Sequence, residues 1–180
     1  MPIKDWVPEE IVQRKQRGFS LIELLMVLAI IGILAAIAIP NLLTAIAKAK
    51  QKRTLLDIKT IAVAWESRAT DINRYNAAGG IEGISMPLSI SALAGALEPT
   101  YSRRIPTLDG WGKKFTCLLD QDWGVTAPAS RYVIISGGAD QTISTGINEG
   151  PFTGYDCDII YTNGVFLTYP EGAQVATATH

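Results

Sequence analysis

A single apolar run near the start of the chain sets the strongest limit on how this sequence can fold. The run extends from Phe19 to Ile39 and contains one charged residue, Glu23. At about 1.5 Å of rise per residue, a helix over this run would be about 32 Å long, which matches a bilayer hydrocarbon core of about 30 Å. We therefore expect residues 19–39 to form a membrane-spanning helix.

Basic residues lie just before this run, at Arg14, Lys15 and Arg17. Cytoplasmic flanks of membrane helices are enriched in lysine and arginine, so the N-terminus should stay in the cytoplasm while the rest of the chain crosses. A secretory signal peptide is the alternative, but its apolar region would be shorter and would end in a small-residue cleavage site. The run is too long for a segment of that class, and the acid is misplaced for it.

Glu23 is the unusual residue of the run. A carboxylate inside a bilayer costs about 3 kcal/mol or more, so an intramembrane acid indicates a function and requires a partner. The plain alternative is a carboxyl group that is protonated or faces water. We expect Glu23 to act in assembly rather than in catalysis.

The segment from Gly18 to Glu23 reads GFSLIE. It resembles the prepilin recognition and cleavage motif shared by type IV pilins and the pseudopilins of type II secretion. In that family a membrane peptidase cuts after the glycine and methylates the new N-terminal amine. The resemblance implies that residues 1–18 are a leader peptide, cut between Gly18 and Phe19, and that Phe19 becomes N-methylphenylalanine.

Cleavage would create a positively charged amine at Phe19. A neighbouring subunit, displaced along a filament, could place that amine beside Glu23, where each charge neutralises the other in a medium in which an unpaired charge is costly. Glu23 and Pro40 stand where the family has its acid and its proline. We assign both residues to filament assembly.

The apolar helix is expected to continue as an amphipathic stalk over residues 40–78. Pro40 lacks a backbone donor, which predicts a kink or a locally melted turn around it. Beyond it, apolar residues recur with the spacing of one helical face. The segment from Ala77 to Gly80 then favours a helix end, since glycine adopts left-handed C-cap geometry. The apolar face comprises Leu55, Ile58, Ala62, Trp65, Ala69 and Ile72.

Residues 79–180 are expected to form a globular head. A short helix is predicted over residues 92–97 with Ser91 as its N-cap, within a connection from Ile81 to Ile105. Several strand-like runs follow, and Asn163-Gly164 between the last two is a hairpin turn signal. The pattern predicts an α+β fold, in which a small antiparallel sheet packs on the second half of the long N-terminal helix. The runs are Lys114–Leu119, Arg131–Ser136, Asp158–Tyr161 and Val165–Thr168.

The head resembles that of the major, G-type pseudopilin of type II secretion. The turn from Asp109 to Gly112 reads Asp-Gly-Trp-Gly, where that family usually has Asp-Pro-Trp-Gly. The segment from Ser136 to Asp140 is similar to the family's strand end, which reads serine-x-glycine-x-aspartate. The resemblance implies the pilin fold.

In those pseudopilins the loop after this strand binds a calcium ion. The resemblance therefore implies a calcium site at Asp140, completed by Asp156 and Asp158, since calcium takes about six to eight oxygen ligands. The loop from Gln141 to Tyr155 is poor in acid, however, with only Glu149 in it. The alternative is a glycine-rich loop without a metal.

The chain has two cysteines, Cys117 and Cys157. A head beyond the membrane meets an oxidising compartment, where we expect a disulfide between them; the alternative is two buried thiols. A zinc site is not expected, because the cysteines lack CxxC spacing and the one histidine is His180. The net charge of −1 gives no sign of a nucleic-acid partner.

Two functions remain open from the sequence. The first is a structural subunit of a type II secretion-like pseudopilus, a filament that drives protein export. The second is a type IV pilin of a surface pilus for adhesion, twitching motility or DNA uptake. An enzyme is not expected, since the sequence contains no GxSxG, HExxH or GxxxxGK motif.

The resemblance also implies partners and a location. The partners would be other copies of the chain, sibling pseudopilins or pilins, the prepilin peptidase, an inner-membrane assembly platform and a cytoplasmic ATPase. The chain would cross the bacterial inner membrane once, with a cytoplasmic N-terminus and a periplasmic head. The assembled filament would lie in the periplasm or on the cell surface.

Overall fold

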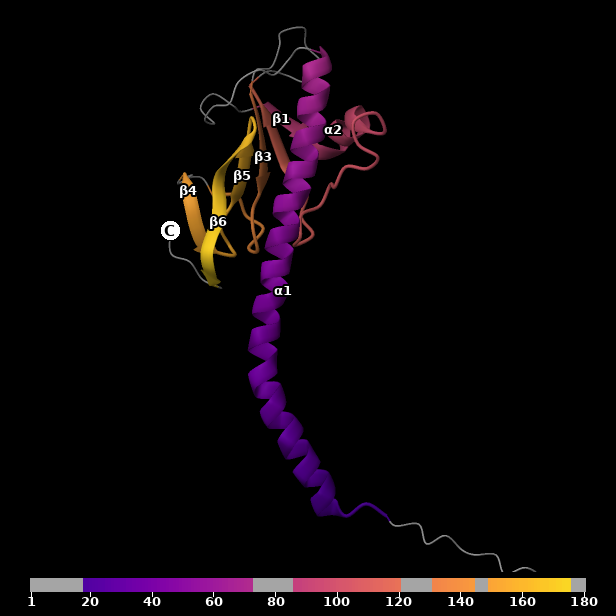
Figure 1. Ribbon diagram of the computed structural model, residues 1–180, viewed down its shortest axis with the longest axis vertical. Coiled ribbons are helices and arrows are strands. Elements are labelled where there is room, and N and C mark those ends of the chain that lie inside the picture. Colours follow the sequence, from indigo (N-terminus) through magenta and orange to yellow (C-terminus); the bar gives the residue numbers. More distant parts are fainter. Residues whose placement is uncertain (1–17, 73–85, 121–130, 145–148, 176–180) are drawn as a thin grey trace, which may run out of the picture. The chain divides into compact units, whose positions relative to one another are not determined.

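The computed structural model describes residues 18–72, 86–120, 131–144 and 149–175. The chain forms two compact units, residues 1–40 and residues 41–180. Its helices and strands are labelled in Figure 1. In chain order they are α1 (Leu21–Ile72), β1 (Met86–Ser89), α2 (Ile90–Leu97), β2 (Thr116–Leu119), β3 (Tyr132–Ser136), β4 (Gly150–Gly154), β5 (Ile159–Thr162) and β6 (Val165–Val175).

The helix α1 contains 52 residues and begins in the apolar run. It passes through Pro40 without a break in helical structure, so the melted turn predicted there is absent. A proline removes one backbone hydrogen bond and crowds the preceding turn, but the leucine, isoleucine and alanine residues around it support the helix on both sides. The helix end predicted over residues 77–80 lies outside the described residues.

The second unit contains a six-stranded sheet in the order β1-β2-β3-β5-β6-β4. Neighbouring strands are antiparallel, except that β4 and β6 run parallel. The α+β prediction is confirmed, but the sheet is mixed rather than wholly antiparallel. Strands β1 and β4 were not predicted, because Pro87 and the Gly150-Pro151 pair interrupt the alternating pattern by which strands are recognised.

The predicted hairpin forms between β5 and β6, where Thr162 pairs with Val165. Between them, Asn163 and Gly164 have φ angles of 39° and 96°, the left-handed conformations that a two-residue hairpin turn needs. This local signal was sufficient to locate the turn.

The predicted short helix is present as α2, but it begins earlier than expected. Its N-cap is Ser89 rather than Ser91, and the cap makes no side-chain hydrogen bond. Because β1 ends at Ser89, the helix starts as soon as the strand stops. The predicted serine cap was therefore wrong.

The core of the second unit lies between the sheet and the part of α1 that belongs to this unit (Figure 1). Ile58, Ala62 and Trp65 from the predicted apolar face are completely buried there. The Trp65 ring lies 4.6 Å, centroid to centroid, from the ring of Tyr132 on β3. The prediction that the second half of the helix packs against the sheet is confirmed.

Candidate functional site

Glu23 lies in the first turn of α1, and its carboxylate binds the chain's own backbone. The Ser20 amide donates a hydrogen bond of 2.9 Å to Oε2 of Glu23. Since α1 begins at Leu21, Ser20 occupies the N-cap position and Glu23 the third helical position, which is one half of a capping box. This contact was not predicted, although the spacing Ser-x-x-Glu is its signal.

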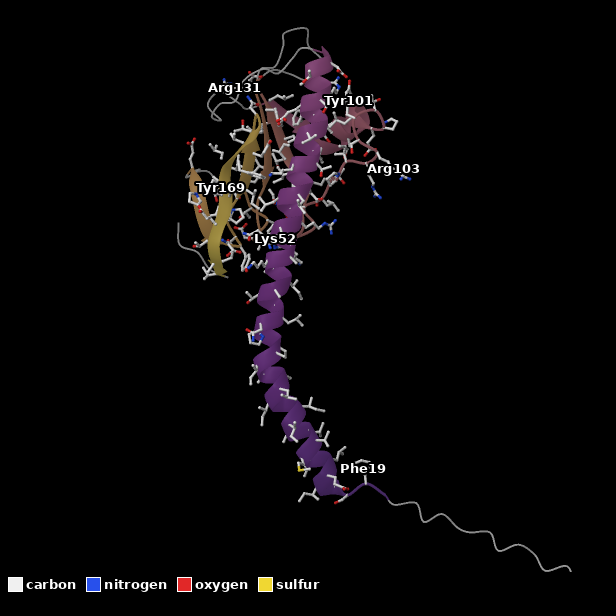
Figure 2. All side chains as sticks on the ribbon, in the orientation of Figure 1. Phe19, Lys52, Tyr101, Arg103, Arg131 and Tyr169 are labelled. Atoms are coloured by element: carbon white, nitrogen blue, oxygen red, sulfur yellow. The ribbon has the colours of Figure 1, made fainter. Side chains whose placement is uncertain are left out.

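The predicted cleavage site lies immediately before this turn. Phe19 is 84% exposed (Figure 2), and no heavy atom among the described residues lies within 4 Å of the position that a side chain at Gly18 would take. Packing among the described residues therefore gives no reason for a glycine at position 18. Cleavage between Gly18 and Phe19 stays a prediction.

The helix beyond Glu23 presents a continuous apolar surface. In the first unit, the large apolar side chains from Leu21 to Ile39 range in exposure from 44% for Val27 to 76% for Leu21. The most apolar 18-residue window has a mean hydropathy of 2.9 and no buried residue. By length and composition this helix can cross a membrane, and a surface of this extent must be covered by lipid or by other protein chains.

The Asp109 turn in the head is organised around a buried carboxylate. Asp109 is only 3% exposed. Its Oδ1 accepts hydrogen bonds from the amides of Trp111 at 3.0 Å and Lys113 at 2.9 Å, and its Oδ2 accepts one of 2.8 Å from the Ser136 hydroxyl. These bonds explain why an aspartate opens the turn, and they join the turn to the end of β3.

The second position of this turn departs from the family's proline, and the structure gives the reason. The Gly110 amide donates a hydrogen bond of 2.9 Å to the Thr54 hydroxyl, which in turn donates one of 3.0 Å to the Lys50 carbonyl. A Cβ atom at Gly110 would lie 2.2 Å from that carbonyl oxygen. A proline could neither donate this bond nor fit against the helix at this distance.

The three acids predicted to bind calcium lie close to one another but do not form a ligand set. Burial is the main cause of the raised pKa of the Cys157 thiol, and the charges of all three carboxylates raise it further. Asp140 accepts bonds from the amide and hydroxyl of Thr142, and Asp158 Oδ2 accepts a bond of 2.7 Å from the Ser144 amide. In the described part of the chain, no three or more aspartate, glutamate, histidine or cysteine side chains are grouped to hold a metal ion. The residues therefore do not fit the predicted site.

The predicted disulfide is not formed in this structure, where Cys117 and Cys157 are buried free thiols. Cys117 lies on β2, where it pairs with Ile134 on the neighbouring strand β3. Cys157 lies beside Gly138, on the side of β3 that faces away from β2. Strands two positions apart in a sheet are about 10 Å apart, whereas a disulfide spans at most about 7 Å between Cα atoms. The intervening strand keeps the sulfur atoms apart, and the alternative of two buried thiols holds.

Comparison with known proteins found a family model and several relatives that are similar to this chain. A family model described as the prokaryotic N-terminal methylation motif matches residues 13–39. The type II secretion system core protein G of Aeromonas hydrophila is 31% identical over 114 residues, which cover 62% of this chain and 79% of that protein. The core protein G of Vibrio cholerae is 33% identical over 112 residues, which cover 62% of this chain and 76% of that protein. No solved structure matches the chain.

A pilin shows a shorter similarity. The type IV major pilin protein PilA of Myxococcus xanthus is 47% identical over 62 residues, which cover 34% of this chain and 28% of that pilin. The similarity to the G proteins instead covers more than three quarters of each relative, at 31% and 33% identity. Together with the methylation motif and the α+β fold, this extent shows that the chain belongs to the family of the type II secretion system core protein G.

Proposed function

We propose that this protein is a structural subunit of a type II secretion pseudopilus, and that it assembles through its N-terminal helix into a filament that drives protein export. Its role is mechanical rather than catalytic. The observation that carries the proposal is the single carboxylate, Glu23, at the start of an apolar helix whose side chains are exposed. Membrane lipid covers that surface before assembly, and other copies of the helix cover it in the filament.

The contact of Glu23 with Ser20 is compatible with a second contact in the filament. A carboxylate has two oxygens and about four sites that accept hydrogen bonds, of which the Ser20 amide uses one. Cleavage after Gly18 places a new amine at Phe19, and the remaining acceptor sites of Glu23 can bind the amine of an adjacent subunit. Capping and charge pairing are thus two separable contributions of one side chain.

The variant Glu23→Gln separates these contributions. Glutamine keeps an acceptor for the Ser20 amide, as it does in other capping boxes, but it carries no charge. We expect Glu23→Gln and Glu23→Ala to be inserted and processed as in the wild type, and both to yield few filaments when sheared filaments are collected by sedimentation and quantified. Wild-type filament yield from Glu23→Gln would overturn the pairing of charges as the basis of assembly.

The proposal includes processing and location. The prepilin peptidase removes residues 1–18 and methylates Phe19. The mature chain then resides in the inner membrane with its head in the periplasm. An assembly platform and a separate cytoplasmic ATPase extract it from the membrane together with sibling pseudopilins. Protease added to spheroplasts should digest the head. Protection of the head in intact spheroplasts would contradict this orientation.

A type IV pilin of a surface pilus is the second candidate, favoured by the 47% identity to the Myxococcus xanthus pilin. That similarity covers only 34% of the chain, so it supports this candidate less well. Deletion of the gene distinguishes the two functions. Loss of protein export with normal surface motility supports the pseudopilus, and the opposite result supports the pilus.

A further inference from the structure

The loop that follows β3, residues 137–144, is tied to the Asp109 turn by a lysine. The Nζ of Lys113 donates a hydrogen bond to the backbone carbonyl of Gln141, and the Gln141 side-chain amide donates one of 3.4 Å to the Trp111 carbonyl. Gln141 has a φ of 61°, a left-handed conformation that is uncommon for residues other than glycine. The ammonium group therefore contacts the one non-glycine residue of this loop that has a left-handed backbone.

Lys113 is well placed for this contact because its own backbone is held on both sides. Its amide donates a bond of 2.9 Å to Oδ1 of the buried Asp109, and its carbonyl accepts a bond of 2.7 Å from the Asp109 amide. The turn thus presents the ammonium from a rigid base. Its neighbour Lys114 is also exposed and serves as a comparison.

The other polar groups of the loop bond to the chain itself. Thr142 and Ser144 donate to the carboxylates of Asp140 and Asp158, and the Ala139 amide donates a bond of 2.8 Å to the Tyr155 carbonyl. The backbone is also closely packed, since a Cβ atom at Gly138 would lie 2.7 Å from the Cys157 carbonyl oxygen. These contacts order the loop in the way that a bound cation would otherwise do.

We propose that Lys113 takes the place of a metal ion in this head, holding the loop of residues 137–144 through the Gln141 carbonyl, so that the head reaches its full stability without calcium. A fixed ammonium at this carbonyl occupies a backbone oxygen of the kind that calcium binds, and it repels a divalent cation nearby. The proposal concerns the stability of the head and is independent of the assembly role of Glu23.

Thermal unfolding of the full chain in detergent tests this proposal. The melting temperature of the wild type should be the same in excess EGTA as in excess calcium chloride. Lys113→Met, which keeps most of the aliphatic stem, should lower it by about 3 °C in both solutions. The matched control Lys114→Met should leave it unchanged. Hydrogen exchange at the Thr142 and Ser144 amides should be faster in Lys113→Met than in the control.

Two results would overturn the proposal. One is a wild-type melting temperature that rises with calcium and falls with EGTA, which would show that the loop binds the metal. The other is a Lys113→Met variant with the melting temperature and exchange rates of Lys114→Met, which would show that the ammonium does not hold the loop.

Discussion

The hydroxyl oxygen of Thr54 lies 2.9 Å from the backbone nitrogen of Gly110, and the hydrogen bond between them joins α1 to the Asp109 turn across 56 residues of sequence. Thr54 is completely buried. Water therefore cannot replace the bond, and its loss leaves a buried amide without an acceptor, which is costly. This contact couples the second part of the long helix to the segment that leads into β2.

Replacing Thr54 with valine tests this bond while nearly preserving shape. We expect Thr54→Val to lower the free energy of unfolding by about 1–3 kcal/mol, because the Gly110 amide loses its acceptor. Urea unfolding of the full chain in detergent, followed by tryptophan fluorescence, would measure the change. Thr60→Val is the matched control, since Thr60 is exposed and bonds only to the Leu56 carbonyl of its own helix. Equal effects of the two variants would show that the bond to Gly110 contributes nothing specific.

A side chain at position 110 should be poorly tolerated. In Gly110→Ala the new methyl group would start 2.2 Å from the Lys50 carbonyl oxygen, so the turn would have to move away from α1. We expect a loss of about 1–3 kcal/mol, as is typical of overpacking. Gly95→Ala in α2 is the control, because no atom of another described segment lies within 4 Å of its added Cβ. It should be neutral or stabilising, since alanine favours a helix. If Gly110→Ala and Gly95→Ala changed the free energy of unfolding equally, the close approach of Gly110 to the Lys50 carbonyl would not affect stability.

Gly18 should matter for processing and not for folding. Gly18→Val has open space around the new side chain, so the head should unfold at the wild-type temperature. Peptidase recognition should fail, and intact mass measurement should find the leader still attached. The wild type and the control Gly32→Ala should instead each give the mass calculated for its own residues 19–180 with one added methyl group. A fully processed Gly18→Val chain would contradict the assigned cleavage motif.

The two cysteines should be thiols that react only after unfolding. Burial raises the pKa of Cys117 to about 12 and also raises that of Cys157. Because the thiolate is the reactive form, iodoacetamide should label neither residue in the folded protein near neutral pH and both in guanidinium without reductant. Absence of labelling in guanidinium would reveal a disulfide.

The same shift in pKa predicts how stability depends on pH. The folded state keeps Cys117 protonated, while the unfolded thiol ionises above its ordinary pKa of 9.0. The contribution of Cys117 is therefore fully present below pH 9.0 and is lost as the pH rises towards 12. Cys117→Ala should show a smaller fall in the free energy of unfolding over this interval. If the free energy of unfolding fell equally with pH in the variant and the wild type, ionisation of Cys117 would not be the cause of the fall.

Features that depend on neighbouring residues could be predicted well. The apolar face that includes Trp65 was correct because its period is a local property, and so was the turn at Asn163-Gly164. The half capping box at Glu23 was not predicted, although the local spacing of Ser20 and Glu23 is its signal. Strand β4 was missed because it pairs in parallel with β6 and lacks an alternating pattern of its own.

The sequence by itself determined the apolar helix, the motif that begins with a glycine and a phenylalanine, and the position of the acid within the first turn. Each of these depends on hydrophobicity and spacing among adjacent residues. Only the tertiary structure decided three relationships between distant residues. Strand β3 separates the cysteines, the Thr54 hydroxyl accepts a hydrogen bond from the Gly110 amide, and the Lys113 ammonium donates one to the Gln141 carbonyl. These relationships join distant parts of the chain, and strand order and register, which no local pattern encodes, determine which groups meet.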